Sequence, residues 1–331
     1  MGESRAYVYE PGERAAGVYV VVPGLHFLGP DDPRLDRFCR ILAASGFAVV
    51  APFVRAFSGM VLDRTLFDDA NAALFLGRIV ADEHGAGPPA VFSISFGSLL
   101  ALHLAASNDP PAAVLVFGGY ADFLPTVRFA VTGRADHEGA RHQLARDPLN
   151  SPVVFLNVVD HLEMRGDRAM LARAWLSMVH RTWGKMELKA PGARDPHANA
   201  IAAALPSELR VPFLRGCCLD EGALDWLEDG LARAARSLSF LDPSAHVKNA
   251  RCPVVLVHGK DDDVIPYFES VKLSRALPKE QLRNLHLTGL YGHTGASSPT
   301  LRALATETTT LIRMLADLAA APRINPRARF G

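Results

Sequence analysis

The sequence lacks the features that mark several large classes of protein. Its 331 residues carry 35 basic and 35 acidic side chains, so no excess charge of one sign directs it to nucleic acid or to an anionic membrane. Its longest apolar runs have the length of strands, far below the roughly 20 residues of a membrane-spanning helix. We expect no signal peptide, because no apolar region follows the first residues. Hydrophobic residues make up 49% of the chain, which favours an ordinary globular protein.

Cysteine is also scarce. The four cysteines, Cys39, Cys217, Cys218 and Cys252, do not have the spacing of metal ligands. We expect reduced thiols in a cytoplasmic protein, with no bound metal. Cys217 and Cys218 are adjacent and could form a strained vicinal disulfide, but we favour two small residues in a packed segment.

Strand-like and helix-like segments alternate through the first third of the chain. Val18–Val22 is a continuous β-branched and aromatic run, and Leu35, Phe38 and Leu42 form an apolar stripe with helical spacing. The predicted strands are Ala6–Tyr9, Val18–Val22, Phe47–Ala51, Ala90–Ile94 and Ala112–Phe117. One predicted helix begins at Pro33, and a second covers Leu66–Ala81. A third follows the strand Ala90–Ile94 and ends near Ala106. This alternation is typical of an α/β protein with a mostly parallel sheet and helices on both faces.

The alternation stops between residues 122 and 243 and then resumes. Within this insertion the predicted helices are Pro152–His161, Arg168–Trp183 and Ala223–Leu238. After it come a strand at Cys252–His258, a helix at Phe268–Arg275, a strand at Leu285–Leu287 and a helix at Pro299–Ala320. We predict a core formed by residues 1–121 and 244–331. We predict that residues 122–243 form a mainly helical cap over the carboxyl edge of the sheet, where open α/β sheets bind ligands.

Apolar residues of this insertion are expected to line a pocket. They are more numerous than the sheet itself can cover. The residues concerned are Phe155, Leu156, Leu171, Trp175 and Trp183.

The clearest functional signal is the segment from Val91 to the start of the next predicted helix. It places a small-x-Ser-x-Gly turn, Ser93-x-Ser95-x-Gly97, between a strand and a helix. Such a turn is tight enough to require small residues on both sides, and it holds the serine hydroxyl above the sheet as a nucleophile. Ser93 stands where glycine is usual. Ser93 and Ser98 lie too deep in the strand or helix to serve as the nucleophile, so we assign that role to Ser95.

Two motifs follow the serine in the order expected of a catalytic triad. A serine hydroxyl needs a base to take its proton, and the base needs an acid to orient it. An aspartate run, Asp261 to Asp263, follows the strand that ends at His258, and His293 follows the next strand. A solvated loop or a cation site is the alternative interpretation of the aspartate run.

Together these motifs resemble those of the α/β-hydrolase superfamily over residues 1–121 and 244–331. Gly259-x-x-Asp262-x-x-Pro266 is similar to the acid loop of that superfamily, and Tyr291-Gly292-His293 to its histidine loop. The resemblance implies the α/β-hydrolase fold, with Asp262 as the acid and His293 as the base.

The resemblance also implies an oxyanion hole. Pro23-Gly24-Leu25 stands where the superfamily usually has His-Gly-x. The backbone N–H groups of Leu25 and Phe96 would then stabilise the tetrahedral oxyanion.

The remaining histidines favour structural roles. We expect His26, His258 and His286 to be packing or solvated residues. The segment from His137 to His142 is similar to a zinc-binding H-E-x-x-H motif but is one residue longer, so the two histidines would diverge on a helix. We therefore predict no metal site there.

These observations predict a serine hydrolase, carboxylesterase-like, that cleaves an ester or related acyl bond through an acyl-enzyme without a cofactor or metal. A thioesterase, a peptidase or a C–C bond hydrolase would use the same residues. The alternative from another class is a non-catalytic ligand-binding member of the fold. We expect a small acyl substrate as the partner, and neither nucleic acid nor a membrane. The oligomeric state stays open, with a homodimer as one option.

Overall fold

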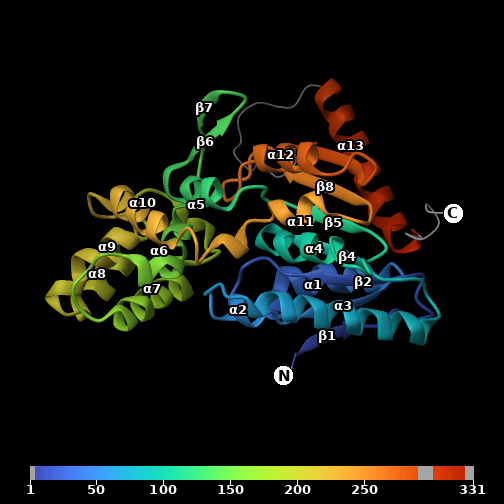
Figure 1. Ribbon diagram of the computed structural model, residues 1–331, viewed down its shortest axis with the longest axis horizontal. Coiled ribbons are helices and arrows are strands. Elements are labelled where there is room, and N and C mark those ends of the chain that lie inside the picture. The colour runs from blue at the N-terminus through green and yellow to red at the C-terminus, as the bar shows by residue number, and fades with distance from the viewer. Residues whose placement is uncertain (1–3, 290–300, 325–331) are drawn as a thin grey trace. The chain divides into compact units, whose positions relative to one another are not determined.

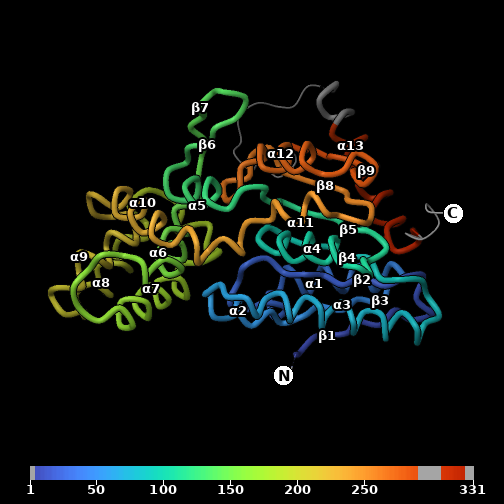
Figure 2. The backbone as a smooth tube through the Cα atoms, in the orientation of Figure 1, coloured from blue at the N-terminus to red at the C-terminus, as the bar shows by residue number. Residues whose placement is uncertain are grey.

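The computed structural model of the protein describes residues 4–289 and 301–324. The chain divides into two compact units. Unit 1 comprises Met1–Gly59, Asp63–Asp122 and Asp242–Gly331, and unit 2 comprises Met60–Leu62 and Phe123–Leu241. The longer segment of unit 2 follows Asp122 and ends before Asp242. Figure 2 traces the backbone through both units, coloured by residue number.

Unit 1 contains a seven-stranded sheet with the order β1-β3-β2-β4-β5-β8-β9 (Figure 1). All neighbouring strands pair in parallel except β1, which is antiparallel to β3 at one edge. The strands are β1 (Ala6–Tyr9), β2 (Val18–Val22), β3 (Ala48–Pro52), β4 (Ala90–Ile94), β5 (Val114–Phe117), β8 (Val254–Gly259) and β9 (Leu282–Thr288). Strands β2 and β3 are buried along their whole length, as their continuous apolar sequences require in a sheet covered on both faces.

Helices pack on both faces of this sheet. On one face, the side chains of Tyr19 and Phe92 join a core with Cys39 of α1 and Leu318 of α13. On the other face, Gly77 of α3 lies directly against Val20, and His258 of β8 contacts Ser270 of α12. The helices of unit 1 are α1 (Pro33–Ala44), α2 (Arg55–Ser58), α3 (Thr65–His84), α4 (Ser98–Ala105), α11 (Ser244–Lys248), α12 (Phe268–Ala276) and α13 (Leu301–Ala320). The fold class predicted from the sequence is therefore confirmed.

Strand β9 is longer than the sequence pattern predicts. It begins at Leu282, three residues before the apolar segment that suggested it. Its first half carries the polar residues Arg283 and Asn284, which both bond to the carboxylate of Asp317 on α13. Because β9 is an edge strand, polar residues are tolerated there, and hydrophobicity alone could not detect them.

Unit 2 is mainly helical and has its own aromatic core. The rings of Phe155, Trp175 and Trp226 lie within 6.2 Å of one another, and Trp175 Nε1 donates to the Phe213 carbonyl at 3.1 Å. Its helices are α5 (Phe123–Thr132), α6 (Ser151–Val158), α7 (Arg168–Thr182), α8 (Asp195–Ala204), α9 (Ser207–Gly216) and α10 (Ala223–Ala234).

The expectation that the apolar residues of this unit line a pocket is wrong for most of them. Phe155 and Trp175 are fully buried in the core of unit 2, and Leu156 and Leu171 are buried with them, whereas Trp183 is partly exposed. The reason is that short helices without a sheet must bury their apolar stripes against one another. These side chains therefore hold the unit together.

A short loop of unit 1 sequence also belongs to unit 2. Residues Met60–Leu62 cluster with it, and Asn157 of α6 holds them. The Asn157 side chain accepts from Leu62 N at 2.7 Å and donates to the Met60 carbonyl at 2.9 Å. One amide side chain thus supplies the acceptor for the Leu62 N–H and a donor for the Met60 carbonyl.

The segment from His137 to His142 is a β-hairpin and not a helix. Strands β6 (Arg134–His137) and β7 (Ala140–Gln143) pair antiparallel around a turn at Glu138 and Gly139, both with positive φ. His137 and His142 therefore do not lie on one helix, because the positive-φ pair between them favours a hairpin turn. Within the described residues, no group of three or more His, Cys, Asp or Glu residues could hold a metal ion.

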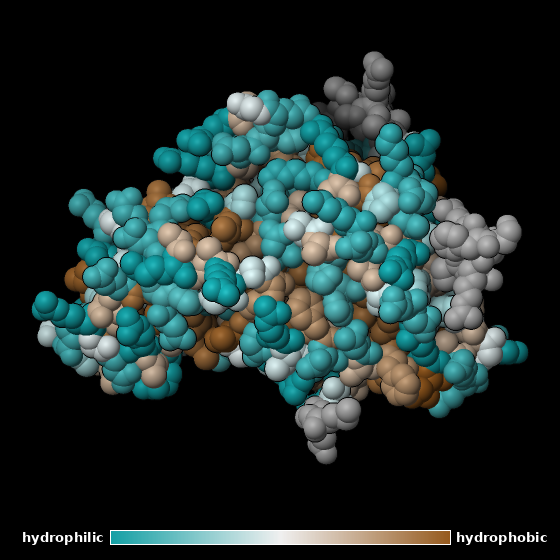
Figure 3. Space-filling view, viewed as in Figure 1, coloured by the Kyte–Doolittle hydropathy of each residue, from teal (hydrophilic) through white to brown (hydrophobic). Residues whose placement is uncertain are grey.

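The surface in Figure 3 is covered mainly by hydrophilic residues, with smaller hydrophobic areas among them. Among the described residues, no helix is both long enough and apolar enough to cross a membrane. The four cysteines are free thiols, three of them buried.

Candidate active site

Ser95 has a backbone conformation that a serine rarely adopts. Strand β4 ends at Ile94, and a single 3₁₀ turn, Ser95–Gly97, leads directly into α4. Ser95 has a φ of 51°, in the left-handed region. For a residue with a side chain this costs about 1–2 kcal/mol. Such strain is concentrated at functional sites, where the surrounding fold maintains it.

The two residues flanking Ser95 at a distance of two have no room for larger side chains. A Cβ atom at Gly97 would collide with the carbonyl oxygen of Pro23. Ser93 is fully buried, and its hydroxyl donates to the Leu115 carbonyl on the neighbouring strand at 3.3 Å. The turn therefore requires the small residues that the sequence has at these positions.

The loop that follows β2 lies against the turn at Ser95. A Cβ atom at Gly24 would lie 3.3 Å from the Ile94 carbonyl oxygen and 3.4 Å from Ser95 Cβ. Leu25 is the next residue, and within the described part of the chain its N–H donates to no acceptor. The structure thus places Leu25 in the loop beside Ser95, and Phe96 at the start of the turn that leads into α4.

The ring of Phe96 is held by two other aromatic rings of unit 1. Its centroid lies 4.9 Å from that of Tyr120 and 6.4 Å from that of Phe57 on α2. Tyr120 is fully buried, and burial raises the pKa of its hydroxyl well above the usual value. These contacts hold the Ser95–Gly97 turn at the edge of the sheet where β5 ends.

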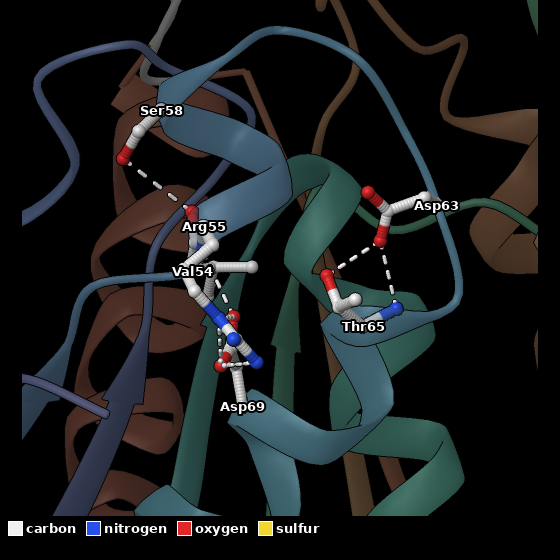
Figure 4. Close-up of polar contacts among 6 residues, drawn as sticks. All are labelled: Val54, Arg55, Ser58, Asp63, Thr65 and Asp69. Atoms are coloured by element: carbon white, nitrogen blue, oxygen red, sulfur yellow. Dashed lines mark hydrogen bonds and ion pairs between the residues drawn. The ribbon is translucent and has the colours of Figure 1, made fainter. Parts of the chain in front are cut away.

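Helix α2 is in turn tied to α3 by an ion pair (Figure 4). The carboxylate of Asp69 accepts from Arg55 N at 2.9 Å and lies 2.8 Å from Arg55 Nη2. At the start of α3, Asp63 accepts from Thr65 N at 2.7 Å. Asp69 is 1% exposed, so this pair anchors the short helix that carries Phe57.

Asp262 is oriented by the backbone of its own loop. Its Oδ1 accepts from Val264 N at 2.8 Å and from Ile265 N at 2.9 Å. Its Oδ2 lies close to Gly118, which has a φ of 66° at the end of β5; a Cβ atom there would be 3.4 Å away. Because β4, β5 and β8 are parallel, Asp262 and Ser95 follow strands at the same edge of the sheet.

His258 is a structural residue at this edge. Its ring is fully buried, with Nδ1 2.6 Å from Ser270 Oγ and Nε2 2.9 Å from the Ile265 carbonyl oxygen. Nε2 also lies 3.4 Å from Asp262 Oδ2. Both ring nitrogens are therefore engaged within the acid loop and α12, which leaves neither for a serine.

His26 and His286 are also engaged by carboxylates. His26 Nδ1 accepts from Leu28 N at 3.1 Å and its Nε2 lies 3.4 Å from Asp32; burial lowers the pKa of this imidazole. His286 is buried, and its Nε2 lies 2.8 Å from Asp317. All three histidines thus have packing or structural roles in unit 1.

His293, the predicted base, lies outside the described residues. The strand that precedes its loop ends in a defined way, because Glu307 of α13 accepts from Thr288 Oγ1 at 2.8 Å and from Gly289 N at 3.0 Å. The described residues therefore bring Ser95, Leu25 and Phe96 together and place Asp262 at the same sheet edge. The role of His293 stays a prediction.

Sequence reasoning missed two supports of this edge. Glu269 of α12 is 2% exposed and accepts from the backbone N–H groups of Ala121 and Asp122, both at 2.9 Å. The Arg55–Asp69 pair was missed as well. The available signal was an acidic residue on the buried side of a predicted helix, which must have a partner.

No protein-family model matches the sequence, and no curated protein matches it. Solved structures do resemble it. An acylaminoacyl peptidase from Pyrococcus horikoshii is 14% identical, with 98% of this chain and 42% of the peptidase covered and a TM-score of 0.48. A putative non-heme bromoperoxidase from Mycobacterium tuberculosis H37Rv is 13% identical, with coverages of 95% and 96% and a TM-score of 0.46.

An alpha/beta hydrolase from Sphaerobacter thermophilus is 15% identical, with 92% of this chain and 95% of that protein covered and a TM-score of 0.43. The chain spans about two fifths of the length of the peptidase. A shared fold does not imply a shared activity. The strand order, with one antiparallel strand at the edge and helices on both faces, shows by itself that this chain has the α/β-hydrolase fold.

Proposed function

We propose that the protein is a serine hydrolase that cleaves a carboxylic ester or related acyl bond. The observation that carries the proposal is the left-handed Ser95 at a strand-to-helix turn, beside the glycine that precedes Leu25. A serine held in this way presents its hydroxyl at the sheet edge where parallel α/β sheets bind ligands. The strain is retained because neighbouring groups leave the turn no alternative.

In the proposed reaction, Ser95 Oγ attacks the substrate carbonyl carbon and His293 takes the hydroxyl proton. The tetrahedral oxyanion accepts hydrogen bonds from the N–H groups of Leu25 and Phe96. His293 then donates its proton to the leaving group, and an acyl-enzyme forms. Water, activated by His293, hydrolyses the acyl-enzyme and restores Ser95.

The hydrogen bonds of Asp262 suit it to the role of orienting acid. Two backbone N–H groups hold Oδ1, so the carboxylate cannot rotate freely. Oδ2 keeps capacity to accept a further hydrogen bond, since His258 Nε2 lies nearer to the Ile265 carbonyl than to Asp262. We assign that capacity to His293, whose tautomer it would fix.

Unit 2 is proposed as the cap that selects the acyl substrate. A thioesterase, a peptidase or a C–C bond hydrolase would use the same residues, and a non-catalytic binding protein is the alternative of another class. The four free cysteines favour a reducing compartment, the cytoplasm. We propose a small acyl molecule as the partner, with no cofactor.

The test is hydrolysis of p-nitrophenyl esters from acetate to decanoate. We expect Ser95→Ala to abolish turnover, and Asp262→Asn to lower kcat by about 10⁴-fold because the imidazole then adopts the wrong tautomer. Asp261→Asn is the matched control and should change kcat little. Full activity of Ser95→Ala would refute the nucleophile, and a crippled Asp261→Asn would shift the acid by one residue. A wild-type protein that binds an ester without turnover would favour the non-catalytic alternative.

A further inference from the structure

A second candidate site lies within unit 2, apart from the residues assigned to hydrolysis. It is a cavity of about 270 Å³ whose wall includes Pro148 and three cationic side chains, Arg146, Lys189 and Arg194. One carboxylate, that of Asp195 at the start of α8, also lines it. Cations gathered around a small cavity require negative charge to balance them.

Arg194 is a buried cation with most of its donors unused. The residue is 7% exposed, and its Nη1 donates to the carbonyl oxygen of Pro148. A guanidinium has five N–H donors. Among the described residues no other acceptor serves this group, and none of its nitrogens is both buried and without a partner. Its remaining nitrogens are therefore not fully buried, and Arg194 lines the cavity.

Arg146 lines the same cavity, and its hydrogen bonds within the protein are long. Its Nη1 donates to the Ala130 carbonyl and to Ser151 Oγ, both at 3.3 Å. Arg146 and Arg194 line the same cavity, and burial lowers the pKa of Arg146. Within the described part of the chain, neither of these arginines forms an ion pair.

The other charges around the cavity do not neutralise both arginines. Lys189 Nζ lies 2.9 Å from a carboxylate oxygen of Asp147, so these two charges cancel. Asp195 offsets one further cation. Among these described side chains, three cations and two carboxylates leave a net charge of one positive. Partly buried cations without partners are costly, and a bound anion would remove that cost.

We propose that this cavity is a binding site for a small oxyanion, a phosphate or carboxylate group held between Arg146 and Arg194. The planar guanidinium matches the geometry of both groups and can bind their oxygens in pairs. The competing interpretation is that both arginines serve only to satisfy the carbonyl oxygens of Ala130 and Pro148. The proposal does not depend on the proposed hydrolysis at Ser95.

The test is calorimetric titration of the full chain with inorganic phosphate at constant ionic strength, with chloride as the compensating anion. We expect saturable binding, weakened at least tenfold in Arg146→Gln and in Arg194→Gln. The matched control is Arg210→Gln, because Arg210 also donates to backbone carbonyls of unit 2 but lies off the cavity. This variant should bind phosphate as the wild type does. Parallel titrations with acetate and citrate distinguish a carboxylate ligand from a phosphate ligand.

A second variant keeps the proposal falsifiable if an arginine variant does not fold. Lys189→Gln removes a cation from the cavity wall and leaves its partner Asp147 unneutralised, so it should also weaken binding of whichever anion binds the wild type. Ser95→Ala should bind the anion unchanged, which separates this site from the proposed active site. The absence of saturable binding of phosphate, acetate and citrate to folded wild-type protein would overturn the proposal. Equal loss of binding in Arg210→Gln would do the same.

Discussion

At the scale of single residues, the backbone of Ser95 is the feature on which the proposed catalysis depends. Its left-handed conformation is unusual for a residue with a Cβ atom, and the adjacent chain enforces it. Gly97 lies against Pro23, and Gly24 against Ile94 and Ser95 itself. The turn therefore cannot relax without moving the loop that carries Leu25, which couples the nucleophile to the proposed oxyanion hole.

Because of this strain, glycine at position 95 should raise stability relative to alanine, whereas glycine within a helix lowers it. Ser95→Gly should be more stable than Ser95→Ala by about 1 kcal/mol, because only glycine adopts a φ near 51° without steric cost. Chemical denaturation of the two variants measures the difference. The control is Ala200→Gly in the exposed middle of α8, where glycine should lower stability by about 0.5–1 kcal/mol. Equal stabilities of the two Ser95 variants would mean that the turn is not strained.

The sequence predicted the residues of this turn but not the contacts that hold it. Small residues around Ser95 are a local pattern, and a local pattern can be recognised without a structure. The same holds for Asp262, whose oxygen bonds to amides two and three residues later. The contact of Gly97 with Pro23 joins residues that are distant in the chain, and no local pattern encodes it.

At the scale of elements, α2 and α3 form a support for the turn. Asp69 is buried and bonds to both the backbone and the side chain of Arg55, and α2 places Phe57 against Phe96. Removal of the carboxylate would leave the backbone N–H of Arg55 without its acceptor. The pair therefore contributes to the position of the turn as well as to stability.

We expect Asp69→Ala to destabilise the protein by about 1–3 kcal/mol, the cost of leaving buried hydrogen-bonding groups unsatisfied. Asp136→Ala is the control, because Asp136 and Arg141 form a pair in which both side chains are 70% exposed. Exposed pairs contribute little, so that variant should unfold close to the wild type. Urea denaturation measures both. A loss in Asp69→Ala no larger than in Asp136→Ala would show that the pair does not anchor α2.

Elements with a strong apolar pattern can be predicted from the sequence. Elements that depend on contacts with other parts of the chain, or on an unusual backbone conformation, cannot. The continuous runs of β2 and β4 specify buried strands directly. The polar half of β9 depends on Asp317 of α13, and the turn of the β6–β7 hairpin depends on two positive-φ residues. Composition suggests that the aromatic residues of unit 2 line a pocket, because it does not show which surface buries them.

At the scale of the whole molecule, a pair of histidines links stability to pH. His103 of α4 and His246 of α11 pack with their ring centroids 5.1 Å apart, and Phe67 lies against both. Burial, with a smaller contribution from the charge of His246, lowers the pKa of His103 to about 4. Burial also lowers the pKa of His246. Both rings are therefore neutral in the folded state at neutral pH.

Stability should fall as the pH decreases from about 6.5, the ordinary pKa of a histidine, towards about 4. In that range the unfolded chain binds protons that the folded chain does not, so protonation favours unfolding. Above pH 6.5 both states are neutral at these positions and the contribution is constant. Thermal unfolding of the wild type and of His103→Gln from pH 8 to pH 4 tests this. A slope that is unchanged in the variant would assign the effect to other groups.

The central claim, that Ser95 is the nucleophile, is tested most directly by labelling the whole protein with an organophosphonate serine probe. Mass spectrometry of the digested protein identifies the modified residue. We predict one adduct, on Ser95, which is absent from Ser95→Ala and is formed more slowly by Asp262→Asn. Labelling of Ser93 or Ser98, or labelling that persists in Ser95→Ala, would contradict the account.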